Sequence, residues 1–215
     1  MRHVKKGREP AAWFEFRKQK EPKPRFDQGP KAELRAALLE EQGYLCCYCM
    51  VPIQESTTRI EHWAPRSRFP ALEVEFSNLL AACAGGEQRR NDDRPAEHHC
   101  DVAKGQRSIT LDPRKPSCER FVVCTSRGEL VPASGAPAFV RDDLNVLNLN
   151  VVRLQRARES MVEAVRRWAV DSGKTLSRAQ LEKKIREFDT PNDAGRLQPF
   201  VGVAIAWLRK HAVQR

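Results

Sequence analysis

The chain has 215 residues, of which 40% are hydrophobic and 31% are charged, so it is long enough to bury a core in one or two domains. Its formal net charge of +10 favours polyanionic partners, because neutralised phosphates release their counterions. No run approaches the roughly 18 consecutive apolar residues of a transmembrane helix, and no apolar segment with a cleavage site follows the basic start. We therefore expect a cytoplasmic protein with no membrane partner.

The first two thirds of the chain predict few regular elements. Residues 1–30 are rich in Lys, Arg and Pro with interspersed aromatics, and predict an extended basic arm that docks on the body or on a partner. A helix should begin after Pro30 and end at Gly43, since proline suits a first turn and glycine a helix end. Residues 44–115 are irregular and hold every candidate site. Residues 121–124 and 129–131 flank a glycine-containing turn and predict a β-hairpin.

The last third of the chain predicts helices. Apolar residues recur at helical spacing from Leu147 to Trp168, which predicts a helix of more than twenty residues. A second helix should begin at Ser177, with Gln180 completing a capping box, and a third should span 200–211. We expect a mostly helical α+β fold, divided into the arm at 1–30, a core at 31–115, and a region of hairpin and helices at 116–215.

The seven cysteines indicate a metal site, because their number is odd and the chain lacks a secretory context. Cys46 and Cys49 form a C-x-x-C pair, and Cys83 and Cys100 offer a second pair. Four thiolates bind zinc tetrahedrally and stabilise segments too irregular to fold alone. We predict a structural zinc site on these four residues.

Some alternatives for the cysteines stay open at this point. His98 or His99, beside Cys100, would also serve as a zinc ligand. A redox C-x-x-C pair normally lies at a helix N-terminus in a βαβ unit, which is missing here. The other three cysteines are interpreted as plain buried thiols: Cys47, Cys118 and Cys124.

A second set of polar residues is interleaved with the cysteines. Glu61 and His62 are followed by Asn78, which precedes two leucines, and by Asp101, with Lys104 three residues later. This order resembles the HNH (ββα-metal) endonucleases. The resemblance implies that His62 is the general base, that Glu61 and Asp101 hold a divalent cation such as Mg²⁺, and that Asn78 braces the loop bearing the histidine. It also implies that Lys104 lies beside a substrate phosphate.

The chemistry explains these residue types. A neutral imidazole has a pKa near operating pH and accepts a proton from water, and a divalent cation neutralises the phosphate and the leaving oxygen. The third family position is usually His or Asn; Asp101 departs from this, although a carboxylate suits Mg²⁺. Because neighbouring strand residues point oppositely, we expect a twist or bulge that lets Glu61 and His62 both reach the phosphate.

Each residue also has a simpler interpretation. A histidine beside a glutamate is often a surface ion pair, and Asn78 would serve equally as a turn residue. Arg66 and Arg68 would clamp a phosphate or simply face solvent. Asp112 and Pro113 are interpreted as a turn.

The similarity extends beyond these motifs. It includes residues 10–13 and 41–50, the HNH positions, and the Leu-Asn-Leu-Asn sequence at 147–150. This order resembles the PtuB-type HNH nucleases of Septu and retron-linked anti-phage defence systems. The resemblance implies a partner ATPase of the PtuA type and a nucleic-acid substrate, with DNA favoured and RNA such as tRNA as the alternative. The arm and the C-terminal helices would dock that partner or simply cover the core.

Two non-catalytic classes compete with a nuclease. One is a zinc module that binds nucleic acid or bridges proteins, and the other is a structural adaptor for an ATPase. Loss of Glu61, His62 or Asp101 would favour them, and all three positions hold acid or base residues.

Overall fold

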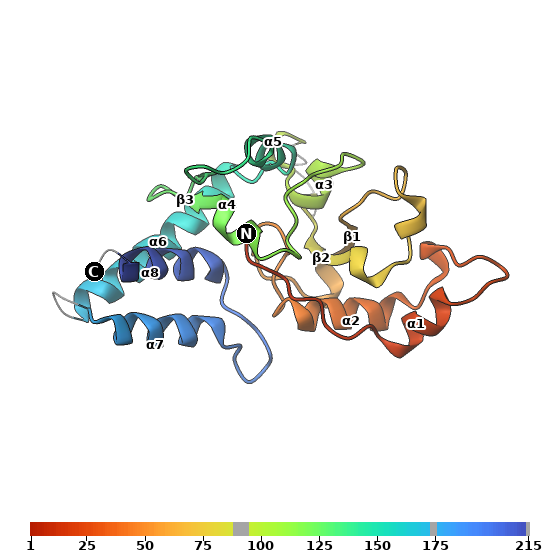
Figure 1. The fold of residues 1–215 in the computed structure, drawn as a ribbon, viewed down its shortest axis with the longest axis horizontal. Coiled ribbons are helices and arrows are strands. Elements are labelled where there is room, and N and C mark those ends of the chain that lie inside the picture. Colours follow the sequence, from red (N-terminus) through yellow and green to blue (C-terminus); the bar gives the residue numbers. More distant parts are fainter. Residues whose placement is uncertain (88–94, 173–175, 214–215) are drawn as a thin grey trace.

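The computed structural model describes residues 1–87, 95–172 and 176–213, and the elements below belong to this part of the chain. It is mostly helical with two small antiparallel sheets, which confirms the predicted α+β class (Figure 1). The helices and strands are α1 (Ala11–Arg17), α2 (Lys31–Glu41), β1 (Thr58–His62), β2 (Leu79–Cys83), α3 (Cys100–Lys104), α4 (Ser117–Phe121), β3 (Val122–Cys124), β4 (Leu130–Pro132), α5 (Phe139–Val146), α6 (Val152–Asp171), α7 (Arg178–Asp189) and α8 (Val201–Val213).

The N-terminal arm differs from the extended segment expected from the sequence. Residues 11–17 form helix α1, and its Trp13 is fully buried, with Nε1 donating to the Val74 carbonyl at 2.9 Å. Helix α2 follows the predicted start after Pro30, and Gly43 lies just beyond its end with a φ of +59°. Glycine accepts this left-handed conformation without the strain that a side chain would add.

Strands β1 and β2 pair antiparallel in a regular register that runs from Thr58 opposite Cys83 to His62 opposite Leu79. Of the expected twist or bulge at Glu61 and His62, the bulge is therefore wrong. The two side chains project to opposite faces of β1, as alternation along a strand requires. Between the strands, a connection over 63–78 folds back into two short 3-10 turns, Pro70–Leu72 and Phe76–Asn78.

The predicted hairpin after residue 120 is confirmed as strands β3 and β4. Its first strand begins one residue later than expected, because Phe121 closes the short helix α4. The turn between the strands contains Gly128, which has a φ of +75° and lies against the Gln155 backbone of α6, leaving no room for a Cβ atom.

The helix predicted to pass through Leu147 and Trp168 is two helices, α5 and α6. Asn148 breaks it with a φ of +46°. The freed carbonyls at the break find tertiary donors: Leu147 accepts from the Cys100 amide at 2.8 Å, and Leu149 accepts from the buried guanidinium of Arg158 at 2.9 Å. Apolar spacing could not show this break, since Leu147 and Val151 keep the helical period across it.

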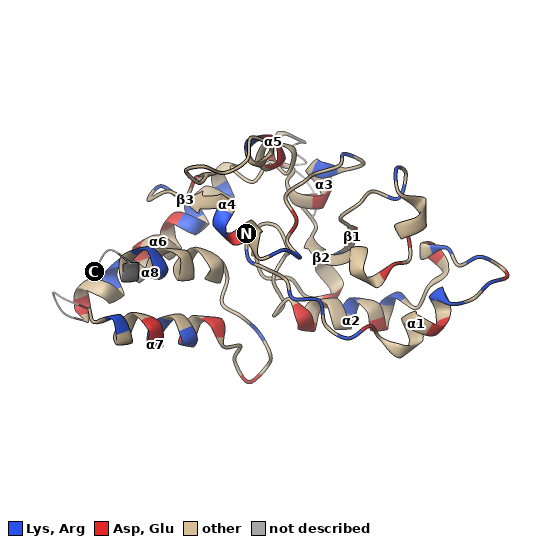
Figure 2. Cartoon of the chain, in the orientation of Figure 1, with Lys and Arg blue, Asp and Glu red and all other residues tan. Residues whose placement is uncertain are grey.

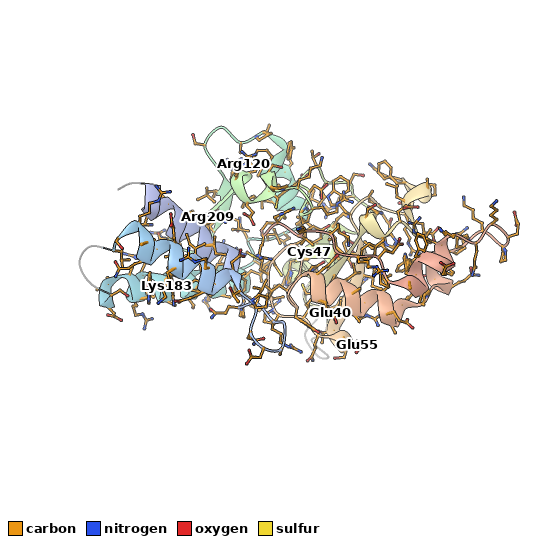
Figure 3. The ribbon with its side chains drawn as sticks, turned by 60° about the horizontal axis from the view of Figure 1, so that its bottom comes forward. Glu40, Cys47, Glu55, Arg120, Lys183 and Arg209 are labelled. Carbon is orange, nitrogen blue, oxygen red and sulfur yellow. The ribbon has the colours of Figure 1, made fainter. Side chains whose placement is uncertain are left out.

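The last two predicted helices are confirmed. Ser177 and Gln180 form the expected capping box at the start of α7, and α8 begins one residue after Phe200. Helices α6, α7 and α8 pack together (left in Figure 1) around a small apolar cluster. The main core is continuous from the arm to α8 and includes Cys47, which is labelled near the middle of the molecule in Figure 3. Within the described ranges, no helix has the length and apolar character needed to cross a membrane.

Candidate functional site

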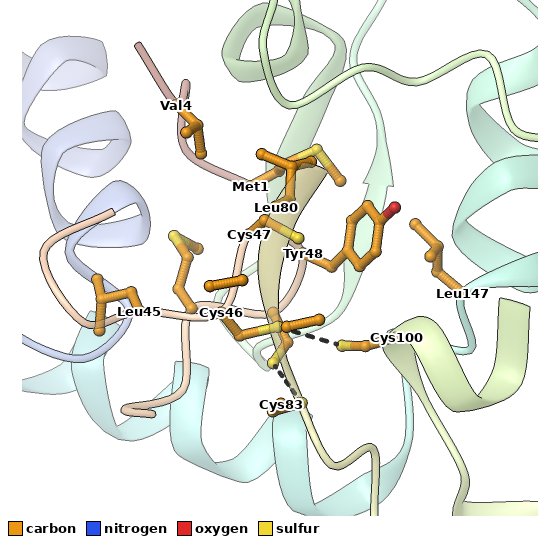
Figure 4. Close-up of a cluster of buried hydrophobic side chains, with 14 of the residues drawn as sticks. Met1, Val4, Leu45, Cys46, Cys47, Tyr48, Leu80, Cys83, Cys100 and Leu147 are labelled. Atoms are coloured by element: carbon orange, nitrogen blue, oxygen red, sulfur yellow. Dashed lines mark hydrogen bonds between the residues drawn. The ribbon is translucent and has the colours of Figure 1, made fainter. Parts of the chain in front are cut away.

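Four cysteine thiols converge in the interior. The sulfur atoms of Cys46, Cys49, Cys83 and Cys100 all lie within 4.8 Å of one another and are buried (Figure 4). Cys46 and Cys100 are 3.8 Å apart, as are Cys49 and Cys83. A tetrahedron with Zn–S bonds of about 2.3 Å has edges of about 3.8 Å. The cluster therefore has the size and the donor set of a four-thiolate zinc site.

Local backbone geometry supplies the first two thiols. Cys46 and Cys49 belong to a turn after α2, in which the Met50 amide donates to the Cys46 carbonyl at 3.0 Å. Met50, directly after the pair, has a φ of +64°, which closes this turn. Cys83 ends β2 and Cys100 begins α3, so the cluster joins a turn, a strand and a helix.

The electrostatics of the thiols suit a cation. Hydrogen bonding from Cys100 lowers the pKa of Cys83 to about 7. Burial opposes ionisation of Cys46, but hydrogen bonds from Cys100 and the other thiols outweigh it and hold the pKa of Cys46 well below its usual value. Burial raises the pKa values of Cys49 and Cys100. A zinc ion would favour the thiolate form of all four.

His99 lies outside the ring of four thiols. Its Nδ1 is 3.2 Å from the Cys100 sulfur, and its Nε2 is 2.7 Å from Nη2 of Arg153 on α6. Because a guanidinium only donates, Nε2 accepts and Nδ1 carries the proton that faces the sulfur. Such outer contacts orient the ligands of a metal site. The three cysteines interpreted as plain buried thiols do not join the cluster, and Cys47 and Cys118 are buried as expected, whereas Cys124 is only half-buried.

The Glu61 carboxylate is buried and has several partners. Its Oε1 accepts from the Tyr48 hydroxyl at 2.8 Å and lies 2.7 Å from the Lys104 ammonium. Burial raises the pKa of Glu61 to about 8; the Asp101 carboxyl adds to the effect and Lys104 opposes it. A divalent cation bound between the two carboxyls would favour the ionised form of Glu61.

Lys104 does not have the position expected beside a substrate phosphate. It is 1% exposed, and its ammonium donates to the His62 carbonyl at 2.8 Å as well as contacting Glu61. Lys104 thus ties α3 to β1 from inside the protein. Its role in catalysis stays a prediction.

Asp101 lies in the first turn of α3 and faces β1. Its Oδ2 accepts from Nε of Arg59 at 2.7 Å, and Arg59 also pairs with Glu87. Arg59 lies two residues before Glu61 and shares its face of β1. The motif comparison did not indicate Arg59, because its contact with Asp101 depends on how α3 packs against the sheet.

His62 faces away from these carboxylates. Its Nε2 lies 2.9 Å from the Glu73 carbonyl and its ring packs edge-on against Phe26 at 4.5 Å. A carbonyl only accepts, so Nε2 carries the proton, and Nδ1 makes no hydrogen bond to any described residue. Burial lowers the pKa of His62, and the charges of Arg66 and Lys104 lower it further. His62 is therefore an oriented, neutral imidazole with a free basic nitrogen.

Asn78 closes the connection between β1 and β2. Its Oδ1 accepts from the Ala64 amide at 2.8 Å, and its Nδ2 donates to the carbonyls of Ala64 and Leu72. The side chain is 1% exposed, which rules out a solvent-facing turn residue. Asn78 thereby fixes the loop that begins directly after His62, the position that the resemblance assigns to it.

The remaining candidates are placed as follows. Arg66 pairs with Asp27 at 3.3 Å, while Arg68 is exposed and makes no ion pair with the described residues. Asp112 forms the predicted turn, since its carbonyl accepts from the Lys115 amide at 3.1 Å. The fold thus unites Glu61 with Asp101 and Lys104, and it sets the His62 ring on the other face of the strand.

The cysteine cluster and the β1-β2-α3 order are the arrangement expected of an HNH nuclease, and comparison with known proteins points to the same class. No family model matches the chain. The protein named "Retron Ec83 putative HNH endonuclease" from Escherichia coli is 28% identical over 165 residues, covering 60% of this chain and 64% of that protein. "Retron Vc95 putative HNH endonuclease" from Vibrio cholerae serotype O1 biovar El Tor is 26% identical over 143 residues, covering 63% and 66%. The chain thus aligns with just under two thirds of each relative's length.

Proposed function

We propose that this protein is a metal-dependent HNH endonuclease that hydrolyses phosphodiester bonds of nucleic acid, DNA in preference to RNA. The observation that carries the proposal is that Glu61 lies beside Asp101, while the next residue on β1, His62, is an oriented, neutral imidazole. The similarity to two proteins named as HNH endonucleases supports it.

Glu61 and Asp101 would hold the catalytic cation. Within the described residues, only the cysteines bring three or more potential ligands together, so these carboxylates offer a two-ligand site. Mg²⁺ commonly binds through one or two carboxylates, several waters and the substrate phosphate, which fits this donor set. When bound, the ion would neutralise charge on the phosphate and the departing oxygen. Lys104 contacts Glu61 and Arg59 contacts Asp101, so these two cations would position the carboxylates.

His62 would act as the general base through Nδ1. The Glu73 carbonyl holds the proton on Nε2 and fixes the ring, and the lowered pKa keeps the imidazole neutral at neutral pH. In an in-line displacement, the attacking water and the leaving oxygen lie on opposite sides of the phosphorus. His62 would supply the base from one face of β1, while Glu61 and Asp101 would hold the cation from the other.

We further propose that the four cysteines bind a structural zinc ion and that the nuclease acts in anti-phage defence with a partner ATPase of the PtuA type. The retron names of the two similar proteins support the defence setting. The ATPase rests on the family resemblance alone. The arm and the C-terminal helices are the candidate surfaces for that partner.

The test is a cleavage assay with purified protein, with and without Mg²⁺, on plasmid DNA and on tRNA. His62→Ala should reduce cleavage by about 10²–10⁴-fold, the usual contribution of a general base, and leave zinc content and folding unchanged. Cleavage that survives in His62→Ala would contradict the assigned base. Absence of Mg²⁺-dependent cleavage, alone and with a partner ATPase, would favour a non-catalytic zinc module.

A further inference from the structure

An open groove of about 700 Å³ lies beside the proposed catalytic residues. One wall is the arm over residues 17–25, and the other is the β1–β2 connection over residues 66–75. The arm after α1 and the tip of that connection lie at the same end of the molecule, and both carry lysines and arginines (Figure 2). The groove therefore joins two segments that are about forty residues apart in the sequence.

The groove adjoins the candidate site at two points. Its wall includes Glu73, whose carbonyl accepts from His62, and Gln106, which follows Lys104 by two residues. Arg66 also lies over the ring of Phe26, and that ring packs on His62. His62 does not itself line the groove, but a strand of nucleic acid there would pass Glu73, whose carbonyl contacts the imidazole.

The charge of the groove suits a phosphate backbone. Four cations and two carboxylates line it, a net charge of +2. Both carboxylates are already paired: Glu73 with Arg25 at 3.5 Å, and Glu75 with Arg17 at 3.5 Å. Lys23 makes no ion pair with any described residue and is exposed, so its charge remains available to a ligand.

An exposed aromatic residue directly precedes the groove lining in the sequence. Phe69 is 44% exposed and adjoins Pro70, which lines the groove. Proteins that bind single strands combine a basic groove with aromatic rings on which bases stack. A duplex keeps its base faces stacked internally, so Phe69 would have no such partner there. The volume also falls within the roughly 300–1,000 Å³ of pockets for drug-sized ligands, room for a nucleotide or two of one strand.

We propose that this groove binds one unpaired strand of nucleic acid, with Lys23 and Arg25 contacting its backbone and Phe69 stacking on a base. This inference rests on the proposed nuclease function and adds the substrate form and the binding surface. It also gives the N-terminal arm a role in holding substrate.

The test measures binding apart from cleavage. Fluorescence anisotropy without added divalent cation would compare a 20-nucleotide oligothymidylate, an oligouridylate and a blunt 20-base-pair DNA duplex. Lys23→Glu/Arg25→Glu should weaken single-strand binding at least about tenfold and flatten its salt dependence, since fewer counterions are released. Phe69→Ala should weaken it about five- to one-hundredfold. The matched control is Lys183→Glu/Arg186→Glu on α7, which makes the same change in net charge far from the groove and should have little effect.

A second readout separates this proposal from the nuclease proposal. Mg²⁺-dependent hydrolysis of bis(p-nitrophenyl) phosphate reports on the catalytic residues alone and should be equal in wild type and groove variants. Equal weakening by both double variants, tighter binding of the duplex, or an unchanged Phe69→Ala variant would overturn the single-strand groove. If no hydrolysis occurs but the groove variants lose binding, the nuclease proposal fails and the groove stands.

Discussion

Two regions of the molecule have interiors of different kinds. One is the region around the four cysteines, and the other is the bundle of the three C-terminal helices. In the cysteine region, buried polar groups such as Gln42, Glu61 and Asn78 each meet specific partners, and four thiols share one small space. In the helices, aliphatic side chains such as Val165 and Leu208 form a separate small apolar cluster. The first region depends on the identity of single atoms, whereas the second depends on volume and spacing.

Removing one thiol should have the largest effect, and it tests whether the cysteine region depends on single atoms. Cys46→Ser should abolish zinc binding and leave the cysteine region unfolded, because zinc contributes about 10–16 kcal/mol in zinc-finger peptides, comparable with the roughly 5–15 kcal/mol that stabilises a whole protein. Metal analysis and circular dichroism would measure both effects. Cys118→Ser is the control, since that thiol is equally buried but faces the Pro113 carbonyl. A Cys46→Ser protein that folds normally without zinc would show that no structural zinc site exists.

A cavity in the helices should have a smaller effect. Leu208 is fully buried in the cluster between α6, α7 and α8, so Leu208→Ala should cost about 2–5 kcal/mol in the free energy of unfolding, measured with urea. Zinc content should not change. Val170→Ala is the control: Val170 is 77% exposed, and its loss should cost less than about 0.5 kcal/mol. If Leu208→Ala also releases zinc, the two regions do not differ in the way described.

The smallest expected effect depends on pH. Burial and Asp101 raise the pKa of Glu61 from 4.5 to about 8. Its contribution to the stability of the metal-free protein is therefore complete below pH 4.5 and is lost as pH rises through 8. Cation binding needs the carboxylate, so apparent Mg²⁺ affinity should rise about tenfold per pH unit up to pH 8 and then level off.

Thermal melts with and without Mg²⁺ from pH 6 to pH 9 would measure this linkage. The Mg²⁺-induced rise in Tm should be smallest at pH 6 and largest near pH 9. Glu61→Gln should remove the pH dependence, because the amide does not titrate. An equal rise at every pH would mean that Glu61 does not bind the ion.

Local signals in the sequence predicted those parts of the fold that local forces decide. The proline start of α2, the capping box at Ser177 and the glycine turn between β3 and β4 lie where they were expected. The break at Asn148 was missed, because the hydrogen bonds that support it come from the distant Cys100 and from Arg158 on the next helix, and neither contact is visible in apolar spacing.

The same distinction applies to the candidate site. The order and spacing of residues in the sequence predicted the four cysteines that converge in the structure. They also predicted Glu61 and Asp101, whose carboxyls lie next to each other. They did not indicate that Lys104 is buried or that Arg59 contacts Asp101, because both contacts arise only when α3 packs on the sheet. They also suggested a bulge where the strand is regular.

The junction between α5 and α6 has a consequence for dissecting this protein into fragments. It holds the segment that leads into α3 at three points: the Leu147 carbonyl accepts from Cys100, the Asn148 side chain donates to the His98 carbonyl, and Arg153 donates to His99. A fragment ending near residue 115 would keep all four thiols and every proposed catalytic residue, yet would lose these three contacts. A minimal fragment should therefore retain the chain through α6.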